Sequence, residues 1–421
     1  MKQRFLTLAA ACLALASCDD QPLASNPEFN WANDPPAVMA IVEANGQQFP
    51  VRVEFHPYGN GVTVRNFSQF PLPSARQAKP DERNRGGGQA PTLDYTWVLP
   101  SNRQSEFILT DDLPSGEQLG YGSPSPKPGA DRSAVAEDRV MPYPRALSFA
   151  PAPPAQPETG SPSGCLAGSP ALVGFSGGNA TEINVCTGRA LRTVSVAGAL
   201  GYAQDLGGGE FLVAAASPAS LQRYSQSSGA AALAAQLPNE ARPLGVALSA
   251  NGMAYVSSFT VQSSRLYAVD LAARRVVNSV LMGNYGTDVA LSPDGTQVWA
   301  SSFFEDSVFV FDAATLEPVA RVTGVVNPFG IDFSPDGTRA YIASAADSFG
   351  SVKVVDTASF STVATVNVGG MPRVVRVTPS GRHVFAANAN SDFISQIDTA
   401  TNRVVRTIRV GGNVMTLALV P

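Results

Sequence analysis

The residue of this chain best suited to covalent chemistry is Cys18, a thiol placed directly after a run of small and apolar residues. The apolar run begins at Phe5, and Lys2 and Arg4 give it a positive start. The run is too short to span a bilayer stably, so its length and charge pattern are typical of a removable export signal. Cleavage before Cys18 would leave that thiol at the new N-terminus.

Two further cysteines, Cys165 and Cys186, remain after the signal and Cys18 are accounted for, because Cys12 leaves with the signal. An even number of thiols in an oxidising compartment favours a disulfide between them. Two separate buried thiols are the alternative.

The other residue types exclude several classes of function. The chain has only two histidines, His56 and His383, and it lacks CxxC and zinc-type spacings, so haem, copper, zinc and catalytic-triad chemistry have little support. We therefore expect no metal and no cofactor. The net charge of −5 becomes −7 without the signal, and no basic face is evident, which argues against a nucleic-acid partner.

Leu15-Ala16-Ser17-Cys18 resembles the bacterial lipobox. The resemblance implies that Cys18 carries lipid and that the chain is anchored to a bacterial membrane, facing the periplasm or the exterior. An ordinary signal with an incidental cysteine is the alternative, and the choice between inner and outer membrane stays open.

Internal repetition dominates the second half of the chain. Equivalent aspartates recur 42, 44 and 42 residues apart, and equivalent glycines recur 43, 42 and 44 residues apart. Each repeat reads as short β-strands separated by tight turns such as "SPDGT", with the aspartate capping a second turn. The aspartates are Asp270, Asp312, Asp356 and Asp398, and the glycines are Gly252, Gly295, Gly337 and Gly381.

These repeats resemble the YVTN-type β-propeller family, most closely in "RHVFAANANSDFISQIDTATNRVVRTIRVGG" and "RAYIASAADSFGSVKVVDTASFSTVATVNVGG". With two weaker upstream repeats that lack the aspartate, six repeats are present, whereas the family commonly has seven blades. The sequence thus predicts an all-β chain with a six-bladed, alternatively seven-bladed, β-propeller. The tail 413–421 matches an inner strand, and we expect it to close the ring by pairing with the first repeat, near 171–196.

The sequence as a whole divides into five expected segments. They are a lipoprotein signal peptide at 1–17, a tether at 18–35, a small β-sandwich-like module at 36–113, a disordered linker rich in Pro, Gly and Ser at 114–164, and the propeller at 165–421.

Alignment of the inner strands predicts a binding face around the channel mouth. One position carries Tyr202, Leu244, Thr287, Phe329, Arg373 and Met415, and its neighbour carries Asp288. The loops between the second and third strands add Phe303, Phe304 and Asn388 to the expected face. Two alternatives are that Asp288 pairs with Arg373 and that both phenylalanines tuck against a neighbouring blade.

We therefore expect a non-enzymatic envelope lipoprotein whose propeller binds a protein, peptide or glycan partner. A propeller hydrolase or lactonase with a channel site is an alternative, although one channel carboxylate makes a poor hard-metal site. A periplasmic carrier of a metal or small ligand is the other.

Overall fold

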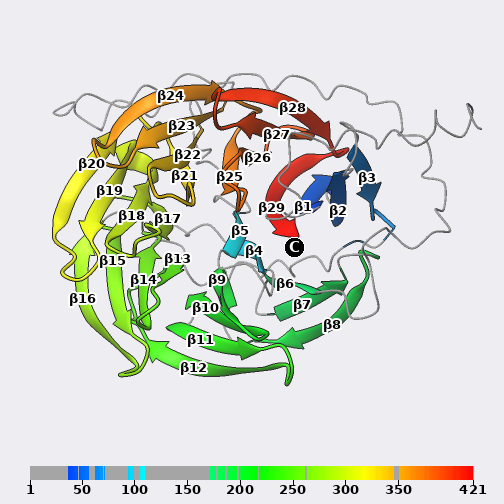
Figure 1. Ribbon diagram of the computed structural model, residues 1–421. Helices are drawn as coiled ribbons and strands as arrows, with labels where there is room; N and C mark the ends of the chain where they lie inside the picture. The colour runs from blue at the N-terminus through cyan, green and yellow to red at the C-terminus, as the bar shows by residue number, and fades with distance from the viewer. Residues whose placement is uncertain are drawn as a thin grey trace, which may run out of the picture.

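The computed structural model is an all-β chain whose antiparallel sheets stand around a common centre (Figure 1). It describes residues 37–45, 47–55, 62–69, 71, 93–98, 105–109, 171–176, 179–184, 187–196, 199–216, 218–260, 263–345 and 350–420. The predicted signal, tether and linker lie outside these residues, as do Cys18, Cys165 and Cys186. Seven sheets are formed within the described part of the chain.

Five of the sheets each use four strands that follow one another along the chain. In every one the first strand lies toward the centre and the fourth lies at the circumference (Figure 1). The first of these sheets contains β9 (Ala199–Gly207), β10 (Glu210–Ala216), β11 (Ala219–Ser225) and β12 (Ala230–Gln236). The second contains β13 (Pro243–Leu248), β14 (Met253–Ser258), β15 (Arg265–Asp270) and β16 (Arg275–Leu281).

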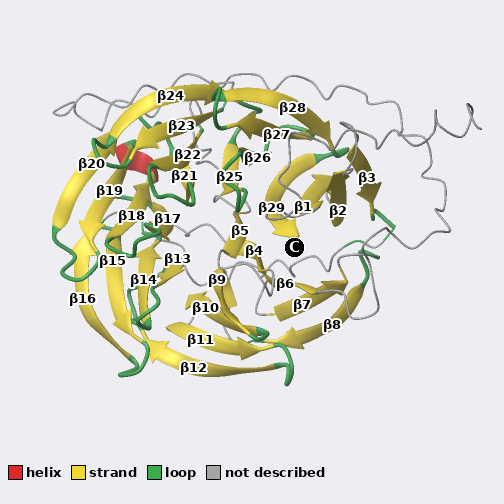
Figure 2. Cartoon of the chain, viewed as in Figure 1, coloured by secondary structure: helices red, strands yellow, loops and turns green. Residues whose placement is uncertain are grey.

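The next three sheets repeat that arrangement, as the sequence predicts. They contain β17 (Gly286–Leu291), β18 (Gln297–Ser302), β19 (Ser307–Asp312) and β20 (Pro318–Thr323), then β21 (Pro328–Phe333), β22 (Arg339–Ser344), β23 (Ser351–Asp356) and β24 (Ser361–Asn367), and then β25 (Pro372–Val377), β26 (His383–Asn388), β27 (Phe393–Asp398) and β28 (Arg403–Arg409). A short 3-10 turn, η2 (Phe303–Glu305), lies between β18 and β19 (Figure 2).

The repeated glycine and aspartate have the local roles expected of them. Gly295 has φ of 73°, which a side chain would disfavour, and its N–H donates to the Ser292 carbonyl at 2.8 Å. Asp312 Oδ1 accepts the backbone N–H groups of Ala314 and Thr315 at 3.0 and 2.9 Å. The Thr315 hydrogen bond is the main cause that lowers the pKa of Asp312. Asp270, Asp356 and Asp398 accept the N–H three residues later in the same way.

The expected pairing of the C-terminal strand with the first repeat is wrong. Strand β29 (Asn413–Val420) pairs instead with β1 (Ala37–Ala44), from Ala37 opposite Val420 to Glu43 opposite Asn413. Strands β2 (Gln47–Phe55) and β3 (Val62–Asn66) complete this sheet. Apolar burial selects the pairing, since Val38 and Val42 of β1 belong to one core cluster with Leu417 of β29.

The separate β module expected at 36–113 is likewise not confirmed. Its first three strands share a sheet with β29. Its other two, β4 (Leu93–Val98) and β5 (Ser105–Leu109), join β6 (Ala171–Ser176), β7 (Asn179–Asn184) and β8 (Ala190–Ser195) in a five-stranded sheet of order β5-β4-β6-β7-β8. The sequence predicts β-structure in this region but not the partners of its strands, because these strands lack the repeat signature.

Candidate functional site

Two ends of the ring differ in chemistry, and the inner strand β17 connects them. We call the end near η2 the loop end, because Gly286 at the start of β17 lies opposite Ser302 just before η2. We call the other end the turn end, because β17 finishes there in the Ser292–Gly295 turn.

The loop end carries an aromatic cluster formed by Phe259, Tyr285, Phe303, Phe304 and Phe329. Tyr285 stands at its centre, with ring centroids 4.0 Å from Phe259, 5.4 Å from Phe303 and 4.9 Å from Phe304. Phe303 continues to Phe329 at 5.2 Å. These rings come from three neighbouring sheets and their connections, so the cluster spans sheet boundaries.

The two adjacent phenylalanines of η2 have different environments. Phe303 is 2% exposed, whereas Phe304 is 46% exposed. The alternative that both tuck inward therefore holds for Phe303 alone. Phe304 remains in contact with Phe303 through an edge-to-face arrangement at 5.2 Å, which orients the exposed ring.

Polar contacts hold the η2 segment in place. Asp306 follows it in the left-handed conformation, with φ of 49°, and its carboxylate accepts the Asn327 N–H at 2.9 Å. The Glu305 carboxylate accepts from the Asn284 amide at 2.9 Å, and the Ser307 hydroxyl donates to the Glu305 carbonyl at 2.7 Å. The exposed Phe304 ring is thus presented by a fixed backbone.

Arg373 and Phe329 converge as their shared inner-strand position predicts. The Arg373 guanidinium lies 5.6 Å from the Phe329 centroid, within the range of a cation–π contact. Both side chains are buried, so they pack beneath the surface of the loop end and do not line an open channel mouth.

The alternative in which Asp288 pairs with Arg373 is not what the structure shows. The Asp288 carboxylate accepts the backbone N–H of Val289 at 2.7 Å and that of Ile331, on the next sheet, at 2.9 Å. The cation that acts on it is Arg376 on β25, the inner strand two sheets further round the ring. Arg373 lies at an irregularity in the pairing of β25 with β26, whereas Arg376 lies opposite Phe385 in the regular part of the strand.

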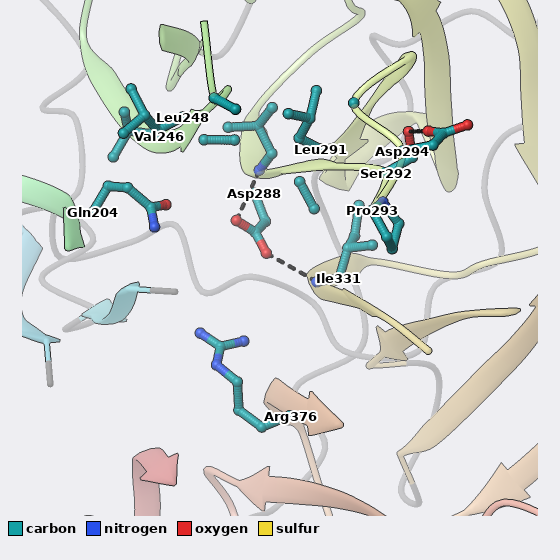
Figure 3. Close-up of a pocket in the computed structure, with 15 residues that line it drawn as sticks. Gln204, Val246, Leu248, Asp288, Leu291, Ser292, Pro293, Asp294, Ile331 and Arg376 are labelled. Atoms are coloured by element: carbon teal, nitrogen blue, oxygen red, sulfur yellow. Dashed lines mark hydrogen bonds between the residues drawn. The ribbon is translucent and has the colours of Figure 1, made fainter. Parts of the chain in front are cut away.

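Asp288 lines a cavity of about 290 Å³ that extends to the turn end (Figure 3). The inner strands β9, β13, β17, β21 and β25 all contribute to its walls. The residues that matter for its chemistry are Gln204, Val246, Leu248, Asp288, Leu291 and Arg376.

Burial dominates the electrostatics of this cavity. It raises the pKa of Asp288 from 3.8 to about 6, and the Ile331 N–H and the Arg376 charge oppose that rise. Asp332 raises the pKa further. Asp205, which closes a turn on the Gly207 N–H at 2.7 Å, also has its pKa raised to about 6 by burial.

The remaining predicted site residues do not join either group. Asn388 is buried, and its amide donates to the Phe393 carbonyl at 2.9 Å and to Ser395 Oγ at 3.1 Å, within its own sheet. The Tyr202 side chain lies outside the described atoms. The backbone register is nevertheless clear, because Ala203 lies opposite Val213.

That register shifts Tyr202 by one position relative to the sequence alignment. Val246 lies opposite Val256, and Val213 is the counterpart of Val256, so Ala203 aligns with Val246 and Tyr202 aligns with Gly245. An irregularity in the pairing of β9 with β10 accounts for the shift.

Sequence reasoning missed Gln204, Arg376 and Tyr285. A signal for the first two was present at one inner-strand position, three residues beyond the one singled out on most strands, where three strands carry alanine and three carry a polar residue. That position is occupied by Gln204, Ala247, Ala290, Asp332, Arg376 and Ala418. A polar residue facing the centre of a ring is the kind of exception that marks a site.

No protein-family model matches the chain, and no curated protein matches it. Among solved structures, it is similar to the hydrazine synthase of Kuenenia stuttgartiensis, with a TM-score of 0.47 and 18% sequence identity over 54% of this chain and 73% of that one. A match at this level says nothing about what this chain binds. Among the described residues, no helix could cross a membrane and no three His, Cys, Asp or Glu side chains gather as a metal site.

Proposed function

We propose that this chain is a lipid-anchored envelope protein of bacteria, related to the YVTN-type propellers, that binds a protein or peptide partner at the loop end of its ring. In this proposal the seven sheets are the seven blades of one closed propeller, and the sheet of β29 and β1 joins its two ends. The Leu15–Cys18 segment supplies the lipid anchor.

The exposure of Phe304 on a fixed turn is the observation that carries the binding role. An aromatic ring on a rigid backbone provides apolar contact area at little entropic cost, and such rings are enriched in the hot spots of interfaces. Buried neighbours Phe303 and Tyr285 keep this ring oriented. A glycan would need polar groups free around the ring, whereas Glu305 and Asn284 bond to each other here.

The binding role is tested by capture of envelope proteins on the full-length chain, with Phe304→Ala as the test variant. Val405→Ala is the matched control, since Val405 is equally exposed at 46% but lies on the outer strand β28. We expect Phe304→Ala to weaken capture by about 2 kcal/mol, with the melting temperature unchanged. Equal capture by both variants would reject the loop end as the binding site. If the chain retained only glycans, the partner would be a glycan and not a protein.

The anchor is tested separately with Cys18→Ala. We expect the variant to be released from membranes by a carbonate wash, while the parent chain stays bound through its lipid. Mass spectrometry of alkylated, unreduced protein tests the proposed Cys165–Cys186 disulfide, and two alkylated thiols would reject it.

A further inference from the structure

The cavity at the turn end brings together three polar side chains from three different sheets. Gln204 comes from β9, Asp288 from β17 and Arg376 from β25, and each is more than nine-tenths buried. Figure 3 shows the Gln204 amide, the Asp288 carboxylate and the Arg376 guanidinium directed toward a common space. At the inner-strand position shared by Gln204 and Arg376, β13 and β17 carry Ala247 and Ala290, and β21 carries Asp332.

Gln204 is the most informative of the three. Its side chain is 7% exposed, and its amide lies on the wall of the cavity. The amide faces the cavity, where it is available to water or to a bound polar group. An amide both donates and accepts, and it therefore suits a polar ligand of either sign.

Asp288 and Arg376 give the cavity two opposite charges. Each Asp288 oxygen accepts one backbone N–H and retains a second lone pair for another donor. Arg376 is a permanent cation whose planar guanidinium suits a carboxylate, in addition to the contacts that it already makes within the protein. The Arg376 guanidinium also donates to the Val375 carbonyl at 2.7 Å, which fixes its direction.

The rest of the wall is apolar and the space is small. Val246, Leu248, Leu291 and Ile331 line it, and a volume of about 290 Å³ lies at the lower end of the range for small-molecule pockets. These dimensions exclude a folded partner and a long oligosaccharide. A small molecule with one cationic end, one anionic end and an apolar body matches all of the walls.

We propose that the turn-end cavity binds a small zwitterion, namely a free α-amino acid with an apolar side chain. Its carboxylate lies against the Arg376 guanidinium and the Gln204 amide, and its ammonium group lies against the Asp288 carboxylate. The aliphatic side chain packs on Val246 and Leu291. This site is separate from the loop end, so either binding role can fail without the other.

The test is isothermal titration of the full-length chain with L-leucine, N-acetyl-L-leucine and L-leucinamide. The acetylated probe lacks the cation, and the amide probe lacks the carboxylate. We expect saturable binding of L-leucine and affinities lower by about tenfold or more for both derivatives, because each loses one charge-assisted contact. Equal binding of N-acetyl-L-leucine would show an anion site and overturn the proposal, as would absence of saturation by L-leucine at about 10 mM.

Two variants assign the binding to this cavity. Gln204→Leu keeps the volume of the side chain and removes its amide, and we expect it to weaken L-leucine binding by about fivefold or more. Gln222→Leu, on β11 of the same sheet and outside the cavity, is the matched control. Unchanged affinity in a folded Gln204→Leu protein would place the site elsewhere and refute the assignment.

Discussion

The carboxylate of Asp288 on β17 accepts the backbone N–H of Ile331 on β21 at 2.9 Å, across the boundary between two sheets. Asp332 on β21 makes the same kind of link to Val377 on β25, at 2.8 Å. Inner strands are edge strands within their own sheets, and such edges expose N–H groups that need partners. The two aspartates supply those partners and join three sheets near the centre of the ring.

Replacement of Asp288 by Asn should destabilise the protein. The amide can accept only one of the two N–H donors that the carboxylate now accepts, and its own NH₂ faces the other donor. We expect a loss of about 1–3 kcal/mol in the free energy of unfolding, measured by urea denaturation. Asp392→Asn is the control, because its ion pair with Arg409 is exposed and should contribute little. Equal stability of both variants would mean that the link contributes nothing.

The raised pKa values of Asp288 and Asp205 predict the sign of a pH effect. Both rise from 3.8 to about 6 on folding, so the folded chain binds more protons than the unfolded chain between about pH 4 and pH 6. Stability from these two groups is therefore fully present below pH 4 and falls as pH rises through 6. Asp312, whose pKa is lowered, acts with the opposite sign and below this window.

Urea denaturation at pH 5, 6 and 7 measures this effect. We expect the free energy of unfolding to fall less steeply with pH in Asp288→Asn than in the parent chain, because one of the two groups no longer titrates. The difference between the two slopes isolates Asp288 from every other titrating group. Parallel slopes would contradict the burial of an ionisable carboxylate at this position.

The repeats made most of the fold predictable. Gly295 and Asp312 and their equivalents each mark a turn by local chemistry that does not depend on the rest of the chain, so they place strand ends from sequence alone. Strand β1 has no such marks. Its pairing with β29 depends on apolar contacts between residues almost 400 positions apart, and periodicity alone does not encode those contacts.

The candidate site was predictable only where the inner-strand alignment kept its register. Phe329 and Arg373 were placed together correctly, because β21 and β25 share one pattern of irregularity after their first proline. The β9 strand departs from that pattern, so Tyr202 was misaligned by one position and Gln204 was overlooked. A one-residue shift moves every side chain of a strand to the opposite face.

Deletion of residues 412–421 should cause a large loss of stability. It would remove β29 and leave β1 with an unpaired edge and an exposed apolar face, including Val38 and Val42. We expect a lower melting temperature, measured by differential scanning fluorimetry, and aggregation, measured by light scattering. Deletion of residues 37–66 removes β1 to β3 but keeps the proposed signal and Cys18, and it should expose the apolar face of β29 that β1 covers. Removal of Pro421 alone is the control, and a melting temperature within a degree or two of the parent after either larger deletion would contradict this pairing.

Truncation of the two neighbouring phenylalanines of η2 should change the free energy of unfolding by very different amounts. Phe303 is buried against Tyr285 and Phe329, so Phe303→Ala should cost about 3–5 kcal/mol of unfolding free energy. Phe304 is almost half exposed, so Phe304→Ala should change stability by only about 0.5 kcal/mol.

A double-mutant cycle measures how firmly the exposed Phe304 ring is held by Phe303. Their rings meet edge to face at 5.2 Å, an arrangement that contributes about 0.5–1.5 kcal/mol beyond area burial. We expect a coupling free energy at the lower end of that range, about 0.5 kcal/mol, in urea denaturation of Phe303→Ala, Phe304→Ala and the double variant, because Phe304 is almost half exposed. A large coupling means that Phe303 orients the partner-binding ring, so Phe303→Leu, which keeps the apolar volume, should retain folding but weaken partner capture. Zero coupling would mean that Phe303 does not hold the Phe304 ring and that only Tyr285 packs against it, which would weaken the case for a rigid aromatic anchor at the loop end.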